Sequence, residues 1–362
     1  MEVWRAAAEG RDVYLFLTGM IALAELAATQ GVFSYLAGRI ARNGRLSAAG
    51  VYWWVYGAGV PVTALLSNDA TILLLTPAAI ALARRTNVSP LPAAFAVAFV
   101  ANAASFVLPI SNPANLLLYP DLPASGAWLA SFLLPSIGAI VVTGVLLFFC
   151  LRRCAAEDAD RTETVANVEV TAALRLTIVL VALSCAALVT AATLHANVGI
   201  TAFGCALISV AAVSTVKRGA AADVVREGQW SIVPLVAALL VAVHFADRFG
   251  AVRFAQAAVH RFGALGHPFD ALATGGAIAA LANAINNLPA AVLAHYAASG
   301  NPAALIGIDL GPNVALTGSL ATILWIRILR KNGITVPGLL FLRIGLLVTV
   351  PALVCSLALL RV

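Results

Sequence analysis

LLSNDATILLLTP (65–77), LPISNPANLLLY (108–119), ANAINNLPAAVLAHY (282–296) and IDLGPNVALTGSLATILW (308–325) each place polar residues inside an otherwise apolar stretch. Pro113 and Pro312 remove backbone donors there, and Gly311 and Gly318 relax the backbone. Because an uninterrupted helix would bury these polar groups in an apolar surrounding, we expect helices that stop and restart around a cavity. The four stretches therefore predict four breaks that converge at one site.

The composition is that of a membrane protein. Of 362 residues, 62% are hydrophobic and 10% are charged, which leaves too little polar surface to cover a soluble globule. Apolar lengths predict eight membrane-crossing helices near residues 13–36, 92–119, 127–151, 173–194, 198–216, 230–246, 303–326 and 336–360. Two interrupted segments, 48–84 and 271–296, are expected to turn back, and the polar stretch 152–171 reads as an exposed linker.

The two halves of the chain are related by an internal repeat. A shift of 219 residues superposes the two turns, and a shift of 207 superposes the two broken helices. The matched pairs are Ser67 with Asn286, Asn68 with Asn287, Asn102 with Asp309, Asn112 with Ser319, and Asn115 with Thr322. Such symmetry, with interruptions at matching places, is typical of secondary transporters.

The predicted fold class is an all-α polytopic membrane protein of two inverted repeats. Each repeat has a helix, a re-entrant hairpin, a broken transmembrane helix and a closing helix. We expect the first repeat over 1–151, a linker with two connecting helices over 152–229, and the second repeat over 230–362.

The distribution of cations predicts the orientation. Loops on one side of this topology carry fifteen Lys or Arg residues and loops on the other side six, with Arg343 inside the last span. The positive-inside rule then places both termini in the periplasm of a bacterial inner membrane, with the first hairpin entering from the cytoplasm. The charge count cannot tell re-entrant from spanning hairpins, but polar backbone at the turns favours re-entry. These basic residues flank apolar spans, so we expect no nucleic-acid partner.

Amides and hydroxyls dominate the four breaks, and they suit a neutral polyhydroxylated solute because they both donate and accept hydrogen bonds. The candidate substrate-binding residues are Ser67, Asn68, Thr71, Asn102, Ser111, Asn112, Asn115, Asn286, Asn287, Asn313, Thr317, Gly318, Ser319 and Thr322. Asp69 and Asp309 are the candidate proton carriers, because an ionisable group at membrane depth is costly and usually functional. Helix capping is the alternative role for Asp69, Asn115 and Thr322.

Other residues carry weaker signals. The five cysteines form no metal-ligand cluster and are expected to be packing thiols. Glu25 and Arg343 could pair or line the cavity, and snorkelling is the alternative for Arg343. His244 and His295 are expected to be packed or interfacial, and His195, His260 and His267 to lie in loops. No phosphate-binding GxxxxGK[ST] motif occurs, and we expect no metal, no cofactor and no enzymatic activity.

IDLGPNVALTGSLATILWIRIL (308–329) resembles a DLGP…GSLAT…LW segment of the arsenite efflux permeases (the ArsB type) of the ion transporter superfamily. SND followed by LLLTP is similar to that family's NDGAALILTP hairpin, and SNPANLL to its SNLVNI break. The resemblance implies extrusion of arsenite or antimonite, as the neutral trihydroxide, in exchange for protons. Some members associate with a soluble ATPase subunit, and a homodimer is the other assembly to consider.

Two departures from that family bear on the expectation. Asn102 stands in ANAAS where the family usually has aspartate in ADTAS, so that proton coupling falls on Asp69 and Asp309. We also expect the chain to begin two helices later than typical members. The second candidate is a sodium-coupled anion or dicarboxylate transporter of the same superfamily. A membrane enzyme and a structural scaffold rank lower, because paired catalytic groups are missing and a scaffold needs no matched breaks.

Overall fold

The computed structural model describes residues 11–32, 35, 38, 46–119, 122–123, 125–152 and 169–360. Those residues form helices joined by turns, without a strand among them. Several parts of the sequence analysis fall outside them: Cys154, most of the predicted linker, and seven of the counted cations, which are Arg5, Arg39, Arg42, Arg45, Arg153, Arg161 and Arg361.

Both halves have the predicted order of elements. In the first half these are α2 (Arg11–Thr29), the hairpin α4 (Ala48–Leu66) and α5 (Asn68–Arg85), the broken helix α6 (Pro90–Ala103), η1 (Pro109–Ser111) and α7 (Pro113–Leu118), and α8 (Ser125–Leu151). In the second half these are α12 (Ile232–Asp247), the hairpin α14 (Phe269–Ile285) and α15 (Asn287–Ala298), the broken helix α16 (Pro302–Leu310), η3 (Gly311–Asn313) and α17 (Leu320–Lys331), and α18 (Gly338–Ala358). Between them lie α9 (Ala172–Thr193), α10 (Val198–Val216) and α11 (Ala220–Glu227), and α13 (Ala251–Gly263) joins α12 to the second hairpin.

Six helices within the described residues are long and apolar enough to cross a membrane. They are α2, α4, α8, α9, α10 and α18, and α11 with α12 adds a seventh if that bent pair is one span. Helix α4 was predicted as a hairpin arm and not as a crossing helix, yet it has the length of one. The predicted spans 92–119 and 303–326 are broken into shorter pieces, as the polar residues within them require.

Two helices were not predicted. Helices α11 and α13 are amphipathic, with apolar residues on one face and charged residues on the other. A search for long apolar stretches does not detect helices of this kind, so both segments were taken for loops. The placement of His260 in a loop was therefore wrong, because it lies in the last turn of α13. His195 and His267 lie in turns, as predicted.

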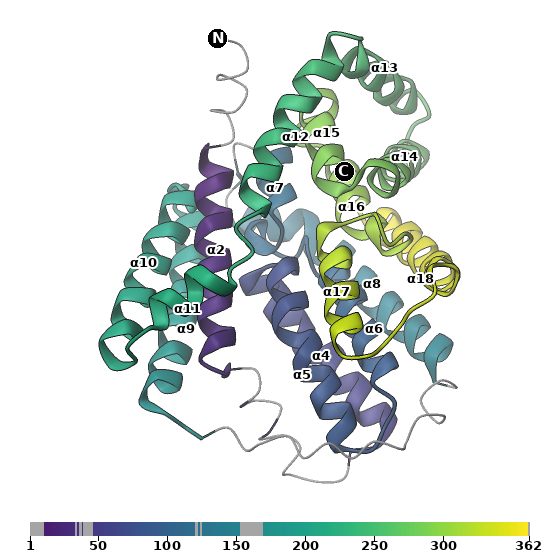
Figure 1. Cartoon of the computed structure of the whole chain (residues 1–362). Coiled ribbons are helices and arrows are strands. Elements are labelled where there is room, and N and C mark those ends of the chain that lie inside the picture. The colour runs from purple at the N-terminus through teal and green to yellow at the C-terminus, as the bar shows by residue number, and fades with distance from the viewer. Residues whose placement is uncertain are drawn as a thin grey trace.

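The two hairpins approach the centre of the molecule from opposite ends (Figure 1). Helices α4 and α5 occupy the lower part of that view, and α14 and α15 the upper part. The second arm of each hairpin packs on the broken helix of the other half, α5 on α17 and α15 on α7, while the closing helices α8 and α18 pack together. This exchange of partners is the arrangement expected of inverted repeats.

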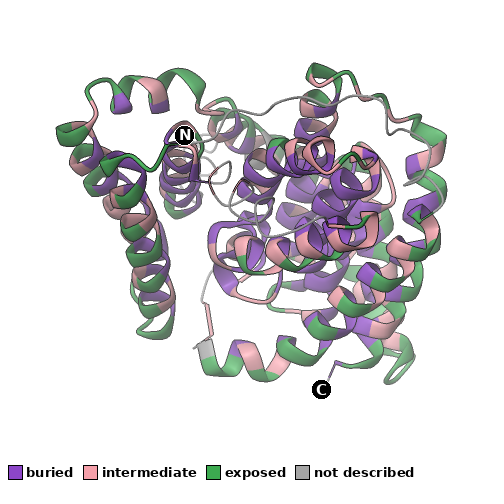
Figure 2. Cartoon of the chain, turned by 90° about the horizontal axis from the view of Figure 1, so that it is seen from below, coloured by how far each residue is buried: buried purple, intermediate pink, exposed green. Residues whose placement is uncertain are grey.

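Helix α6 forms the centre of the core. Its residues from Pro92 to Ala103 are all buried, and half are alanine, which lets neighbouring helices approach closely. Phe95 and Phe99 pack against Trp325 and Phe341 of the second half. Figure 2 shows the same division throughout the molecule, with buried residues on the inner faces of the helices and exposed residues on the outer faces.

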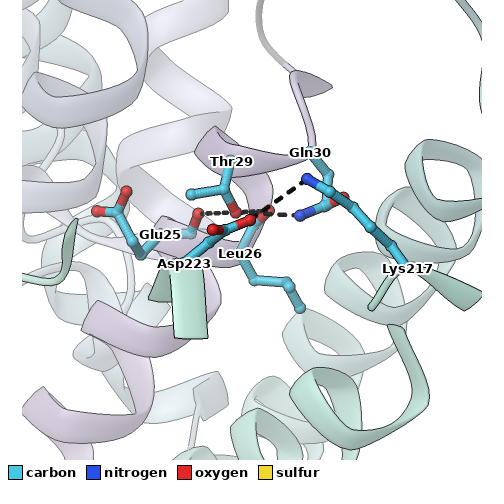
Figure 3. A network of polar contacts seen from close by, with 6 residues as sticks. All are labelled: Glu25, Leu26, Thr29, Gln30, Lys217 and Asp223. Atoms are coloured by element: carbon cyan, nitrogen blue, oxygen red, sulfur yellow. Dashed lines mark hydrogen bonds and ion pairs between the residues drawn. The ribbon is translucent and has the colours of Figure 1, made fainter. Parts of the chain in front are cut away.

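Of the alternatives for Glu25 and Arg343, the described part of the structure does not show pairing. Arg343 is exposed on α18, Glu25 is half-buried on α2, and no ion pair joins them among the described side chains. Near Glu25, the Thr29 hydroxyl donates to the Glu25 carbonyl at 2.9 Å, and Lys217 and Asp223 approach to 3.4 Å (Figure 3). The packing of α11 on α2 holds one end of α2 in place.

We predict that Gly307→Ala destabilises the protein, because a Cβ at Gly307 would collide with the backbone carbonyl of Gly275 where α14 and α16 cross. The backbone cannot yield cheaply, so the expected loss is about 1–3 kcal/mol. Gly204→Ala on α10 is the matched control, since nothing lies within 4 Å of its Cβ position. Thermal unfolding in detergent should show a lower midpoint for Gly307→Ala alone. Equal midpoints would contradict the close crossing.

Candidate functional site

The tips of both hairpins are built alike. Ser67 separates α4 from α5 with φ 124°, and Asn286 separates α14 from α15 with φ 80°. These backbone angles are uncommon for residues other than glycine, and in each case the side chain stabilises the turn by capping the next helix. The Ser67 hydroxyl accepts from Ala70 N at 3.3 Å, and Asn286 Oδ1 accepts from Leu288 N at 3.4 Å. The predicted pairing of Ser67 with Asn286 is thus confirmed in backbone geometry.

The two broken helices also restart alike. Asn112 Oδ1 accepts from Ala114 N at 3.0 Å and caps α7, and the Ser319 hydroxyl accepts from Thr322 N at 3.1 Å and caps α17. Pro113 occupies the first position of α7, where its missing N–H costs nothing. Gly311 has an ordinary helical φ of −51°, so backbone freedom does not explain this glycine. It is needed for space, because a Cβ there would lie 2.7 Å from Ala279.

Two side-chain hydrogen bonds join the breaks of the two halves. Asn112 Nδ2 donates to Asp309 Oδ1 at 2.8 Å, and Asn102 Nδ2 donates to Asn313 Oδ1 at 2.8 Å. Asn313 in turn donates to the Phe99 carbonyl at 3.1 Å. Asp309 is 0% exposed and the three asparagines are 1% exposed, so these bonds lie in the interior. The site is therefore formed by both repeats together.

Four acceptor oxygens at the breaks are buried and have no hydrogen-bond donor in the described structure. They belong to Asn102 (Oδ1), Asn115 (Oδ1), Asn287 (Oδ1) and Asp309 (Oδ2). Leaving a buried polar atom unpaired costs about 1–3 kcal/mol, so four of them together point to a ligand that donates. The stretches 63–71, 102–115, 283–290 and 309–322 contain no Lys, Arg or His. The protein thus offers acceptors and supplies no basic side chain from the breaks.

The remaining predicted site residues differ in how deeply they are buried. Asn68, Thr71, Ser111 and Thr322 are buried, whereas Thr317 is exposed. Gly318 is buried against Pro312. The hydroxyls of Thr71 and Thr63 are 2.8 Å apart and connect the two arms of the first hairpin.

Helix capping, the alternative role considered for Asp69, Asn115 and Thr322, falls to other residues. Ser67, not Asp69, caps α5, and Asp69 lies half-buried in the first turn of that helix. Asn115 and Thr322 are not the caps of α7 and α17, which are Asn112 and Ser319. The Asn115 amide donates to the Ser105 carbonyl at 2.9 Å, and the Thr322 hydroxyl lies 3.0 Å from that of Ser319.

Asn283 is the residue that sequence reasoning missed. Its amide donates to the Gly311 carbonyl at 2.8 Å, its Oδ1 accepts from Ala315 N at 2.8 Å, and its carbonyl accepts from the Thr317 hydroxyl at 3.2 Å. Asn286 and Asn287 add bonds to the carbonyls of Thr317 and Gly318. Asn283 lies in the same polar stretch as Asn286, and that was the available signal, but the stretch does not reveal which side chain reaches across the break.

The two hairpins are tied to their own broken helices unequally. Among the described residues, five hydrogen bonds join the second tip, residues 283–287, to residues 311–318. One bond joins the first tip to its break, from the Ser111 hydroxyl to the Ala64 carbonyl at 3.0 Å. Ala64 is the counterpart of Asn283 under the 219-residue shift, and it has no side chain that could make equivalent bonds.

Comparison with known proteins identifies a solved structure with a similar architecture. Among solved structures, the YdaH transporter of Alcanivorax borkumensis aligns with a TM-score of 0.61 at 15% identity, covering 99% of this chain and 86% of that one. This likeness confirms the predicted fold, which the chain shares with that transporter.

Relatives and a family model agree with that fold. The arsenical pump membrane protein of Escherichia coli (strain K12) is 27% identical over 378 residues, covering 98% of this chain and 86% of that protein. The arsenical pump membrane protein of Yersinia enterocolitica is 28% identical over 394 residues with the same coverage, so the resemblance drawn from the motifs is confirmed. A family model described as citrate transporter, CitMHS, matches residues 6–322. The chain is a multi-pass membrane transporter and belongs to the citrate transporter (CitMHS) family.

Proposed function

We propose that the protein extrudes arsenite or antimonite, as the neutral trihydroxide, from the cytoplasm in exchange for protons. The observation that carries this proposal is the set of four buried acceptor oxygens without donors at Asn102, Asn115, Asn287 and Asp309. A neutral trihydroxide presents three hydroxyl donors, which complement such a set. The names of the arsenical pump relatives support the same substrate class.

In this proposal the substrate site is lined by the amides and hydroxyls of the breaks. Asn102, Asn112, Asn313 and Asp309 hold the two halves together, and the caps at Ser67, Asn286 and Ser319 orient the helix ends around the solute. The other substrate-binding residues remain proposals on the same basis: Asn68, Thr71, Ser111, Asn115, Asn287, Thr317, Gly318 and Thr322. The domain boundaries 1–151, 152–229 and 230–362 are likewise proposed.

Exchange follows from competition at one atom. A proton and a substrate hydroxyl hydrogen compete for Asp309 Oδ2, because protonation turns an oxygen that only accepts into one that also donates. In this proposal the binding of one species therefore weakens the binding of the other, which favours exchange over co-transport. A charged carboxylate that is fully buried is costly, so the proton neutralises Asp309 when the substrate leaves. Asp69 is the second proposed proton carrier.

The cellular setting is proposed from the sequence. The excess of cations on one side of the topology supports a bacterial inner membrane with both termini in the periplasm. A soluble ATPase subunit and a second copy of the chain are the partners that the resemblance to arsenite efflux permeases suggests.

A sodium-coupled anion or dicarboxylate transporter is the second candidate. The family model described as citrate transporter favours it. Four capped helix N-termini also begin at the breaks, those of α5, α7, α15 and α17, and each is equivalent to roughly half a positive charge. Sodium dependence distinguishes this candidate from proton exchange.

We predict that Asp309→Asn reduces arsenite accumulation driven by a pH gradient by about tenfold or more, because the variant cannot carry the proton. Exchange of labelled for unlabelled arsenite should persist, since that reaction needs no net proton movement. Asp223→Asn on the surface of α11 is the matched control and should behave as the parent. If Asp69→Asn and Asp309→Asn both keep full pH-driven transport, the coupling scheme is wrong.

Everted vesicles from an efflux-deficient host should accumulate labelled arsenite when the chain is expressed. A protonophore should abolish accumulation, and replacing sodium with choline should leave it unchanged. Vesicles without the chain control for leak. Sodium-dependent citrate uptake without arsenite uptake, in membranes that contain the protein, would favour the second candidate instead.

A further inference from the structure

Helix α13 separates apolar from cationic residues. Phe254, Ala258 and Phe262 lie on the face toward α14 and α15, and Arg253 and His260 lie on the opposite face. Arg261 follows Phe254 by seven residues, which places it on the same side of the helix as that ring. Such a helix is typical of one that lies in the membrane interface.

The segment around α13 exposes large aromatic rings. Phe249 is 92% exposed and Phe254 is 79% exposed. Rings at this exposure are unfavourable in water, and they are stabilised at the boundary between lipid headgroups and acyl chains. Helix α13 lies at an outer edge of the molecule (Figure 1), where these rings would meet lipid.

A cavity of about 270 Å³ lies between α13 and the two arms of the second hairpin. Its walls are apolar except for Thr274, with Leu281 and Leu293 opposite α13. The exposed Phe254 forms part of the wall, so an acyl chain can reach the cavity from the lipid side. Gln256 Nε2 donates to the Tyr296 carbonyl at 3.0 Å and holds α13 on α15 beside the cavity. An apolar cavity of this kind excludes water and admits an apolar guest.

One cation lies beside the open edge of the cavity. Arg261 is exposed on the same side of α13 as Phe254, whereas Arg253 is exposed on the opposite face, and Asp270 faces His267 at 3.8 Å. An anionic headgroup at the interface would be attracted by the Arg261 guanidinium group. We propose that α13, α14 and α15 form a binding site for one anionic phospholipid, with an acyl chain in the cavity and the headgroup at Arg261. The lipid would touch both arms of the second hairpin, so its occupancy would bear on the movement of that hairpin whatever the transported solute.

The test uses the purified full chain in vesicles with brominated phosphatidylglycerol or brominated phosphatidylcholine at equal mole fraction. Phe254→Trp supplies a reporter at the site, and Leu347→Trp, which replaces a 63% exposed residue on α18, supplies a reporter facing bulk lipid. The parent spectrum is subtracted to remove the six native tryptophans. Arg261 predicts a preference for phosphatidylglycerol of about fivefold at residue 254, which corresponds to about 1 kcal/mol. Residue 347 should show no preference.

Variants then separate the headgroup from the groove. Arg261→Gln should remove the preference at residue 254, whereas Arg226→Gln, which removes an exposed cation on α11, should leave it unchanged. Ala258→Leu, which fills the cavity, should lower lipid retained through purification. Equal quenching by both lipids, or a preference that survives Arg261→Gln, would overturn the site. Retention unaffected by Ala258→Leu would overturn the acyl-chain groove.

Discussion

Every backbone group at a helix break within a membrane needs a partner, because lipid supplies none. In this protein that constraint is met four times by a short polar side chain, at Ser67, Asn112, Asn286 and Ser319. Each side chain satisfies an N–H at the start of the next helix, so that the polar end of that helix can be kept in the interior. The inverted repeat brings these ends together from opposite sides.

The buried polar side chains between the two halves also determine what the site can bind. Asp309 accepts a hydrogen bond from the other half through Oδ1, and Asn102 donates one through its amide nitrogen. In each side chain the remaining oxygen has no donor among the described residues. A rigid frame and a set of open acceptors thus come from the same side chains. In the proposed function, a solute that supplies hydroxyl hydrogens binds these acceptors, and a proton on Asp309 replaces it.

Much of the fold could be predicted because polar residues within long apolar stretches are compatible with few backbone conformations in a membrane. The turns at Ser67 and Asn286 were located from sequence, since no uninterrupted helix could bury them in lipid. Helix α13 was missed, because Arg253 and Arg261 interrupt its apolar residues and short amphipathic helices do not stand out by apolar length. Asn283 was missed because a helical position next to a break does not reveal which side chain will reach across, and only the packing of α14 on η3 decides that.

The unequal ties of the two hairpins have an energetic consequence. With about 1 kcal/mol for each net hydrogen bond, separating the second tip from its broken helix costs about 5 kcal/mol, and separating the first costs about 1 kcal/mol. A difference of about 4 kcal/mol corresponds to roughly a thousandfold difference in the population of the parted state. These hydrogen bonds therefore hold the second hairpin to its broken helix more firmly than they hold the first, whereas α4 and α5 are held to α6 by apolar packing.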